Sequence, residues 1–353
     1  MFSINDYNYE LPESLISQYP EKNRDQCRLL TLNKKTGKIT HLIFNQLYDY
    51  ICPNDVLVIN NTEVVPGRLT GEKETAGKVE ILILNYADTQ KSEFDFNNPV
   101  LKCLVKASKK IKDGKYIFFA HNLKGKVLNS KDGIYTIQFM CNGCFETILY
   151  KIGKIPLPPY IKRTNNEKKE SDRINYQTVF AAQKGAIAAP TAGLHFTDNL
   201  LNKFKKKGIK IAPITLHVGY GTFSPVRTKD IRKHKIHSES YFVSKETAET
   251  INNAKKRGNK IFAVGTTTVR TLEFLAKKNN LIEHGSGNCD LFIYPGYSFK
   301  ITDAMITNFH LPKSTLMMLV SAFAKKKNIL NAYKEAVNLK YNFFSYGDGM
   351  LII

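Results

Sequence analysis

The sequence lacks any hydrophobic run long enough to cross a bilayer, since no window approaches the roughly twenty uninterrupted apolar residues of a membrane helix. Its first residues, Met1 to Asp6, also lack the basic and then apolar pattern of a signal peptide. We therefore expect a cytoplasmic protein with no membrane partner. The length of 353 residues allows one large or two ordinary domains with a sizeable core, and the hydrophobic content of 42% is typical of a soluble globular chain.

Several cofactor-binding signatures are missing as well. Among six scattered cysteines, only Cys141 and Cys144 have the spacing of metal ligands, and no second pair completes a tetrahedral site. We interpret them as reduced thiols near a turn, with zinc as the alternative, and expect no metal. No Walker loop or His-Glu-x-x-His helix occurs, and Gly219 and Gly221 lack the third glycine of a dinucleotide fingerprint. The missing glycine-rich loop argues against an RNA methyltransferase.

Acidic residues are in a clear minority, with 31 Asp and Glu against 52 Lys and Arg, a formal net charge of +21. Such a charge attracts polyanions, and this makes RNA or DNA a natural partner. A solvated surface explains the excess equally well, because lysine runs such as 205–207 and 325–327 fall where helices are expected to end. Charge alone therefore leaves both interpretations open.

The hydrophobic pattern predicts an α/β protein with an inserted β-barrel. Between about Leu69 and Cys144 it consists of short alternating runs separated by turn residues, which is typical of a small barrel or sandwich. We expect the insert at residues 69–151 and the α/β domain at residues 1–68 and 152–353. In the second half, strands alternate with helices, which predicts a largely parallel, barrel-like sheet. Its strands are expected at 186–189, 209–218, 260–264 and 291–294, its helices at 199–207, 245–257 and 269–278, with tail helices at 314–326 and 330–340 and a last strand at 350–353.

Polar and imidazole side chains follow the expected strands of this second half. They lie in the segments 191–195, 216–223, 265–270 and 303–310. Loops at the carboxyl edge of a parallel sheet converge, so we expect His195, His217 and His310 to surround one pocket, although each could instead be a buried structural histidine. The helix start after Gly265 is either an anion-binding turn, to which Arg270 adds donors, or an ordinary helix cap.

The motifs of the chain resemble, in order, those of the S-adenosylmethionine:tRNA ribosyltransferase-isomerase family. They lie at 156–160, 188–197, 215–219, 264–273, 307–315 and 344–348, and the resemblance runs from Leu11 to the terminus. It implies an α/β domain with an inserted β-barrel, and an enzyme of queuosine biosynthesis. Such an enzyme moves the ribosyl part of S-adenosylmethionine onto 7-aminomethyl-7-deazaguanine in tRNA, releases adenine and methionine, and consumes S-adenosylmethionine without a metal.

The resemblance also suggests roles for individual residues. One of the three histidines would be the general base, and His195 ranks first because Gly193 lets its loop approach a substrate. The expected partners are S-adenosylmethionine and tRNA, and the expected state is a monomer. Expected phosphate contacts are Arg68, Lys106, Lys109 and Lys110. Expected substrate-binding residues are Thr191, Gly193, Gly219, Thr222, Thr266, Thr267, Arg270, Asp303, Asn308, Lys313, Ser314, Tyr346 and Asp348.

A few positions depart from the family pattern. Glu63 and Asn342 stand where arginine is expected, Gly67 replaces the usual alanine, and 288–290 disrupts a usual threonine. The loss of two cations would weaken contacts to phosphate or carboxylate. It mildly favours a different hypothesis, a non-catalytic tRNA-binding protein on the same scaffold, which the retained histidines argue against.

Overall fold

Nine strands form the main sheet of the computed structural model, which describes residues 2–87, 95, 97–163, 169–223, 226–277 and 279–353. Its four central strands, β12, β3, β14 and β16, are parallel to one another, and β17 and β1 also pair in parallel. The other neighbouring strands of the sheet pair antiparallel: β15 with β13, β13 with β12, β16 with β17, and β1 with β2. In spatial order the strands are β15 (Gly285–Cys289), β13 (Glu239–Val243), β12 (Lys210–Leu216), β3 (Val56–Asn60), β14 (Ile261–Val264), β16 (Ala304–Asn308), β17 (Gly349–Ile352), β1 (Arg28–Leu32) and β2 (Ile39–Ile43).

The central strands are buried on both faces because helices cover each side of the sheet. In β3, Val56 and Val58 join one core cluster while Leu57 and Ile59 join the other, as the alternation of side chains along a strand requires. The first core includes side chains of α4 (Lys245–Lys256), α5 (Thr266–Leu275), α6 (Thr315–Ala324) and α7 (Lys326–Asn338), and the second includes those of η4 (Phe44–Tyr50) and α3 (Asp198–Lys206). No helix in the described ranges is long and apolar enough to span a membrane.

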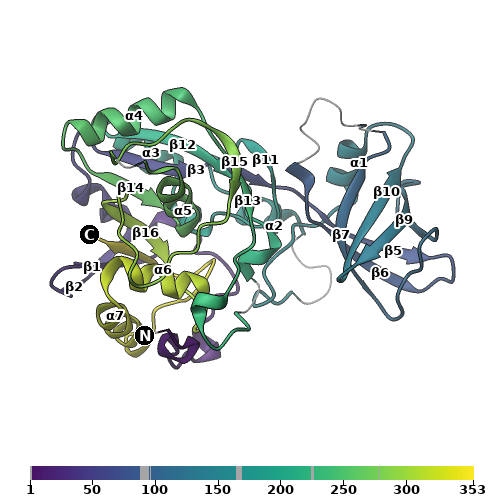
Figure 1. Ribbon diagram of the computed structural model, residues 1–353, viewed down its shortest axis with the longest axis horizontal. Helices are drawn as coiled ribbons and strands as arrows, with labels where there is room; N and C mark the ends of the chain where they lie inside the picture. The colour runs from purple at the N-terminus through teal and green to yellow at the C-terminus, as the bar shows by residue number, and fades with distance from the viewer. Residues whose placement is uncertain (1, 88–94, 96, 164–168, 224–225, 278) are drawn as a thin grey trace.

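A closed six-stranded barrel with a core of its own lies to one side of this α/β body (Figure 1). The chain leaves the carboxyl end of β3, forms the short strand β4 (Thr62–Val64) and then enters the barrel; β4 pairs with β11 (Gln183–Ala186). The barrel is therefore attached at the edge of the sheet where the central strands end. Its elements are β5 (Arg68–Lys73), β6 (Lys78–Ile83), β7 (Val100–Ala107), β8 (Tyr116–Phe118), β9 (Lys124–Lys131) and β10 (Ile134–Met140), followed by α1 (Phe145–Ile152); α2 (Lys169–Asn175) comes later.

The predicted fold class, α/β with an inserted β-barrel, is confirmed, and several details are corrected. The only closed barrel among the described elements is the insert. The segment expected as a strand at 186–189 is mostly loop, because β11 ends at Ala186 and pairs with β4 outside the main sheet. No strand forms at the expected position 291–294; instead, the glycine-rich β15 lies just before this segment. The expected loop 303–310 is largely a strand, β16. We retain 69–151 as our proposal for the insert, because the barrel strands and α1 fall there apart from one residue at each end, Arg68 of β5 and Ile152 of α1.

The barrel leaves no space for a side chain at Gly71. A Cβ there would lie 2.5 Å from the carbonyl oxygen of Phe118, whereas at Gly77 in the next turn it would lie 3.5 Å from the nearest atom, in the flexible side chain of Lys73. Gly71→Ala should therefore destabilise the barrel by about 1–3 kcal/mol. Gly77→Ala is the matched control and should leave the denaturant midpoint nearly unchanged. Equal midpoints for the two variants would show that β5 and β8 do not pack as described.

Candidate active site

A cleft of about 710 Å³, partly open to solvent, lies where β14 and β16 end. Loops from distant parts of the chain form its wall: the turn before α5, the segment after β16, the start of the 3₁₀ helix η6 (Thr191–His195) and the segment before β17. The lining residues are Tyr160, Ala189, Pro190, Thr191, Ala192, Val218, Gly265, Thr266, Thr267, Thr307, Asn308, Phe309, His310, Leu311, Ser314, Leu316, Phe344 and Ser345. This convergence at the carboxyl edge agrees with the expected position of a ligand site.

The N-terminus of α5 forms part of this wall. Gly265 has a φ of +89°, which favours glycine, and its N–H donates to the carbonyl of Ile306 in β16. No side chain caps the helix, and Thr266 and Thr267 line the cleft. The partial positive charge of an uncapped helix start suits an anionic group of a ligand.

His310 is the one predicted histidine that lines the cleft. Its ring is almost completely buried, and Nε2 lies 2.9 Å from Oγ1 of Thr307. Its backbone is fixed on both sides, because its N–H donates to the hydroxyl of Tyr333 and its carbonyl accepts from the hydroxyl of Tyr9. Burial lowers the pKa of His310 to about 3, so the imidazole is neutral at physiological pH.

His195 lies in a separate small cavity that Arg24, Cys27 and Tyr346 help to line. Its Nδ1 is 3.2 Å from Sγ of Cys27, and its Nε2 is 3.0 Å from Nδ2 of Asn308. That amide nitrogen also donates to the carbonyl of Phe344, so Nε2 accepts and Nδ1 carries the proton. Asn308 thus connects His195 to the cleft. Burial, and secondarily Arg24, lower the pKa of His195 to about 4, and burial raises the pKa of Cys27, so both groups are neutral.

His217 does not line the cleft; it lies beside β4, the strand that leads into the barrel. Its Nδ1 is 2.8 Å from Oγ1 of Thr62 in β4, and its ring packs so closely on Gly185 that a Cβ there would come within 2.7 Å. Burial lowers the pKa of His217 to about 4. The structure therefore does not bring the three imidazoles around one pocket. The prediction failed because β11 leaves the main sheet, so that η6 presents Thr191 rather than His195 to the cleft.

A second, smaller cavity adjoins the cleft and contains a buried ion pair. Arg270 Nη1 lies 2.5 Å from Oε2 of Glu239, and Arg270 Nε donates to the carbonyl of Leu291. Glu239 also accepts from the N–H of Gly219, which explains the position of that glycine. The cavity shares Thr266, Thr267 and Leu316 with the cleft, and its other lining residues are Gly221, Ile236, His237, Glu239, Arg270, Phe292, Ile293, Thr315 and Leu319. Sequence reasoning missed Glu239 and His237, for which the polar run just before β13 was the available signal.

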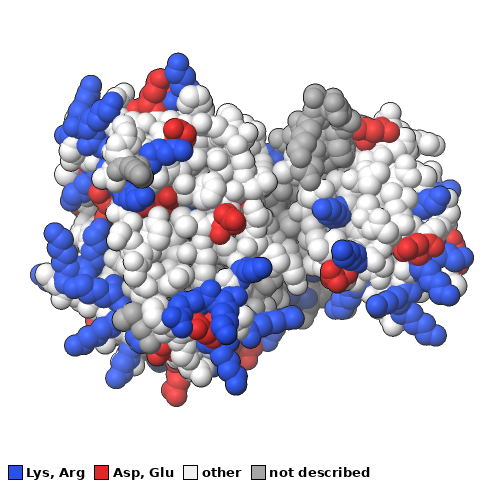
Figure 2. Space-filling view, in the orientation of Figure 1, with Lys and Arg blue, Asp and Glu red and all other residues white. Residues whose placement is uncertain are grey.

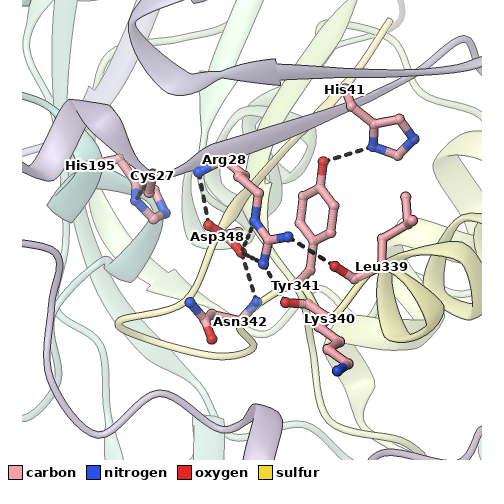
Figure 3. Close-up of polar contacts among 9 residues, drawn as sticks. All are labelled: Cys27, Arg28, His41, His195, Leu339, Lys340, Tyr341, Asn342 and Asp348. Carbon is pink, nitrogen blue, oxygen red and sulfur yellow. Dashed lines mark hydrogen bonds and ion pairs between the residues drawn. The ribbon is translucent and has the colours of Figure 1, made fainter.

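Asp348 and Asp303, which we expected to bind substrate, lie away from the cleft, and each connects segments that are distant in the sequence. Asp348 accepts from the backbone N–H groups of Arg28 and Asn342 and pairs with the Arg28 guanidinium at 3.0 Å (Figure 3). Asp303 precedes β16, so it lies at the amino edge of the sheet, where it pairs with Lys255 and accepts from the N–H of Ile261. Neither carboxylate is placed for substrate, because Asp303 comes before its strand and Asp348 is enclosed by Arg28.

The remaining predicted residues have mixed positions. Ser314 lines the cleft, and its side chain caps the N-terminus of α6. The backbone N–H of Lys313 donates to the carbonyl of Tyr7, near the N-terminus of the chain. Gly193 is needed for packing, since a Cβ would come within 2.6 Å of Phe180. Tyr346 lines the His195 cavity. The side chain of Thr222 lies outside the described residues.

The expected phosphate contacts are exposed lysines on the barrel, with one exception. Lys106, Lys109 and Lys110 are exposed, whereas Arg68 is half-buried and pairs with Glu80 at 3.3 Å. Figure 2 shows basic side chains on both the barrel and the α/β body. Arg68 is therefore less available to a phosphate than the three lysines.

The departures from the family pattern also lie outside the cleft. Glu63 accepts a hydrogen bond of 2.7 Å from the hydroxyl of Tyr150, which connects β4 to α1. The backbone N–H of Asn342 donates to the carboxylate of Asp348. Cys141 and Cys144 have free thiols, and within the described ranges no group of three or more ligand-type side chains could hold a metal. The expectation that the reaction needs no metal stays a prediction.

Comparison with known proteins shows similarity over nearly the whole chain. A family model described as queuosine biosynthesis protein matches residues 4–352. Among solved structures, the crystal structure of S-adenosylmethionine tRNA ribosyltransferase from Thermotoga maritima is 36% identical in sequence. The match covers 99% of this chain and 100% of the other, with a TM-score of 0.55.

The buried histidines predict how stability depends on pH. Folding lowers the pKa of His195 from 6.5 to about 4 and that of His310 to about 3, so below pH 6.5 the unfolded chain takes up protons that the native state does not. Stability should therefore fall as pH decreases from 6.5 towards 4, by up to about 1.4 kcal/mol per pH unit for each histidine.

Denaturant midpoints of the wild type and His310→Gln between pH 7 and 4 test this expectation. The slope should be shallower for the variant, while His284→Gln, at an exposed position, should behave like the wild type. Identical slopes for His310→Gln and wild type would contradict the buried, neutral state of His310.

Proposed function

The chain belongs to the queuosine biosynthesis protein family, and we propose that it transfers and isomerises the ribosyl moiety of S-adenosylmethionine onto 7-aminomethyl-7-deazaguanine in tRNA. The products are epoxyqueuosine in tRNA, adenine and methionine. The observation that carries the proposal is the cleft at the carboxyl edge of the sheet, where six of the residues expected to contact substrate converge with an uncapped helix start. These six are Thr191, Thr266, Thr267, Asn308, His310 and Ser314.

The composition of the cleft suits a flat heterocycle joined to polar groups. Tyr160 and Phe344 lie with ring centroids 4.8 Å apart on one part of the wall and offer apolar faces to a base. Thr191, Thr307 and Asn308 supply hydroxyl and amide groups for ribose, and the N–H groups at the start of α5 suit a carboxylate. Each moiety of S-adenosylmethionine thus has a matching surface.

We propose His310 as the general base that removes the proton from the ribose 5′ carbon. It is the only one of the three histidines in the cleft wall, and its neutral imidazole is the form that accepts a proton. Its low pKa weakens it as a base, and the neighbouring sulfonium of the substrate compensates in part by acidifying that carbon. His195 then acts indirectly, by orienting Asn308.

The direct test is adenine release from S-adenosylmethionine in the presence of tRNA that carries the deazaguanine precursor. His310→Ala should slow adenine release by about two to four orders of magnitude and leave tRNA binding nearly intact, because the residue acts on the reacting carbon. His284→Ala serves as the control and should release adenine at the wild-type rate. Wild-type release by His310→Ala would reject its role as the base, and no release by the wild-type protein would reject the reaction.

We propose that tRNA contacts the barrel through Lys106, Lys109 and Lys110. The affinity for tRNA should fall steeply with salt, because each phosphate contact releases counterions. The triple alanine variant should bind more weakly and with a shallower salt dependence than the wild type, whereas Arg68→Ala should change the slope little, since Arg68 already pairs with Glu80. An unchanged slope in the triple variant, measured by filter binding at several salt concentrations, would contradict these contacts.

A further inference from the structure

A strongly basic segment, residues 227–235, lies at the surface shortly before β13. It contains five lysines and arginines but only one carboxylate, that of Asp230. Figure 2 shows basic side chains gathered low on the α/β body, where Figure 1 shows this part of the chain beside the N-terminus. All five cations are exposed: Arg227, Lys229, Arg232, Lys233 and Lys235. Of these, only Arg232 pairs with a carboxylate of the described residues, that of Asp230 at 2.7 Å.

Helix ends do not explain the charge of this segment. The lysine run 205–207 falls at the end of α3, where the helix dipole favours cations. The basic segment, in contrast, contains only the short 3₁₀ helix η8 (Ile231–Lys233), and three residues are too few for a comparable dipole. The four cations without a carboxylate therefore have no such local explanation.

Aromatic rings lie directly beside these cations. The guanidinium of Arg232 lies over the ring of Phe2, 4.5 Å from its centroid, and Phe2 is 37% exposed. The ring of Phe2 packs edge-on against Tyr294 at 6.3 Å, and Tyr294 contacts Phe292 at 5.2 Å. Cations that contact phosphates, combined with rings on which bases can stack, are typical of surfaces that bind single-stranded nucleic acid.

The backbone holds Phe2 and the basic segment together. The N–H of Ile4 donates to the carbonyl of Lys229, and the N–H of Ile231 donates to the carbonyl of Phe2. The side chain of Ile231 is fully buried in the first core, so it anchors the middle of the segment. The ring of Phe2 is thereby fixed among the exposed cations, and this reduces the conformational entropy that a bound base would cost.

The N-terminal segment also connects the basic segment to the cleft. It runs from Phe2 to Tyr9, whose hydroxyl donates to the carbonyl of His310 in the cleft wall. A chain of this length spans at most about 25 Å, and η1 (Ile4–Tyr7) shortens the path. Phe292 in addition lines the small cavity that adjoins the cleft. A few nucleotides next to one held in the cleft can therefore reach the basic segment.

We propose that the basic segment, together with Phe2, Phe292 and Tyr294, binds unpaired RNA nucleotides next to the one held in the cleft. The lysines contact phosphates, and the ring of Phe2 stacks on a base. The inference rests on the proposed function, in which the reacting base belongs to tRNA, and it adds an RNA contact on the α/β body to the lysines of the barrel. An RNA loop is then a better ligand than a duplex, because only unpaired bases can stack on a protein ring.

Binding of two RNAs to the whole protein tests the stacking. One probe is the hairpin of an anticodon arm, and the other is a blunt duplex with the same number of phosphates. Phe2→Ala should weaken hairpin binding about five- to a hundredfold, as expected for the loss of one base stack, and leave duplex binding unchanged. Phe2→Tyr keeps the ring and should bind the hairpin like the wild type.

Phe274→Ala is the matched control for Phe2→Ala. Phe274 is also 37% exposed, but it lies near the C-terminal end of α5. Its loss should leave the affinities for both RNAs unchanged. Unchanged hairpin binding by Phe2→Ala, or an equal loss for hairpin and duplex, overturns the proposal.

A triple alanine variant of the basic segment tests the phosphate contacts. The slope of log affinity against log salt for the hairpin should become shallower by about 2, as expected for three contacts to a single strand. The variant carries Lys229→Ala, Lys233→Ala and Lys235→Ala. The control removes the same charge from exposed positions of α3 and should keep the wild-type slope; it carries Lys203→Ala, Lys205→Ala and Lys206→Ala. Equal slopes for the two triple variants overturn the contacts.

The assay for adenine release separates this inference from the proposed function. Release by the wild type, with the same KM for tRNA in Phe2→Ala, leaves the function standing and rejects the surface. A selective loss of hairpin binding in Phe2→Ala, without release by the wild type, supports the surface and rejects the reaction.

Discussion

The side chain of Asn60 ties together the strands and the helix that form the cleft. It lies at the carboxyl end of β3, is almost fully buried, and exchanges two hydrogen bonds of 3.0 Å with the backbone of Leu216 in β12. Its Nδ2 also reaches Oγ1 of Thr267 in α5 at 3.4 Å, and its Oδ1 accepts from the N–H of Thr62, where the chain turns towards the barrel. One amide therefore fixes the spacing between two strand ends, the helix start and the path into the insert.

The sequence was most informative where one rule of local geometry decides the outcome. β3 and β14 read as continuous apolar runs and lie in the centre of the sheet, and the alternating runs from Val79 to Phe139 form the barrel. The expectation was less accurate at the edges of elements. β15 consists mainly of glycine and polar residues, which have little strand propensity, so its existence depends on pairing with β13.

The candidate site illustrates why residue type alone does not predict a role. Thr266, Asn308 and His310 line the cleft as expected, because each lies at the end of a central strand or within two residues of it. Asp348 and Arg270 are equally polar, yet both are engaged by partners that are distant in sequence, Arg28 and Glu239. Such long-range pairs depend on the tertiary fold, and no local spacing in the sequence reveals them.

The central claim is that the chemistry takes place in the cleft at the carboxyl ends of β14 and β16. A crystal structure of the protein with S-adenosylmethionine tests it most directly. Our account predicts density for adenosine between Phe344 and Thr191, beside His310, with the sulfur near the first turn of α5. Adenosine bound in the cavity of His195 and Cys27, or on the barrel, would contradict the account.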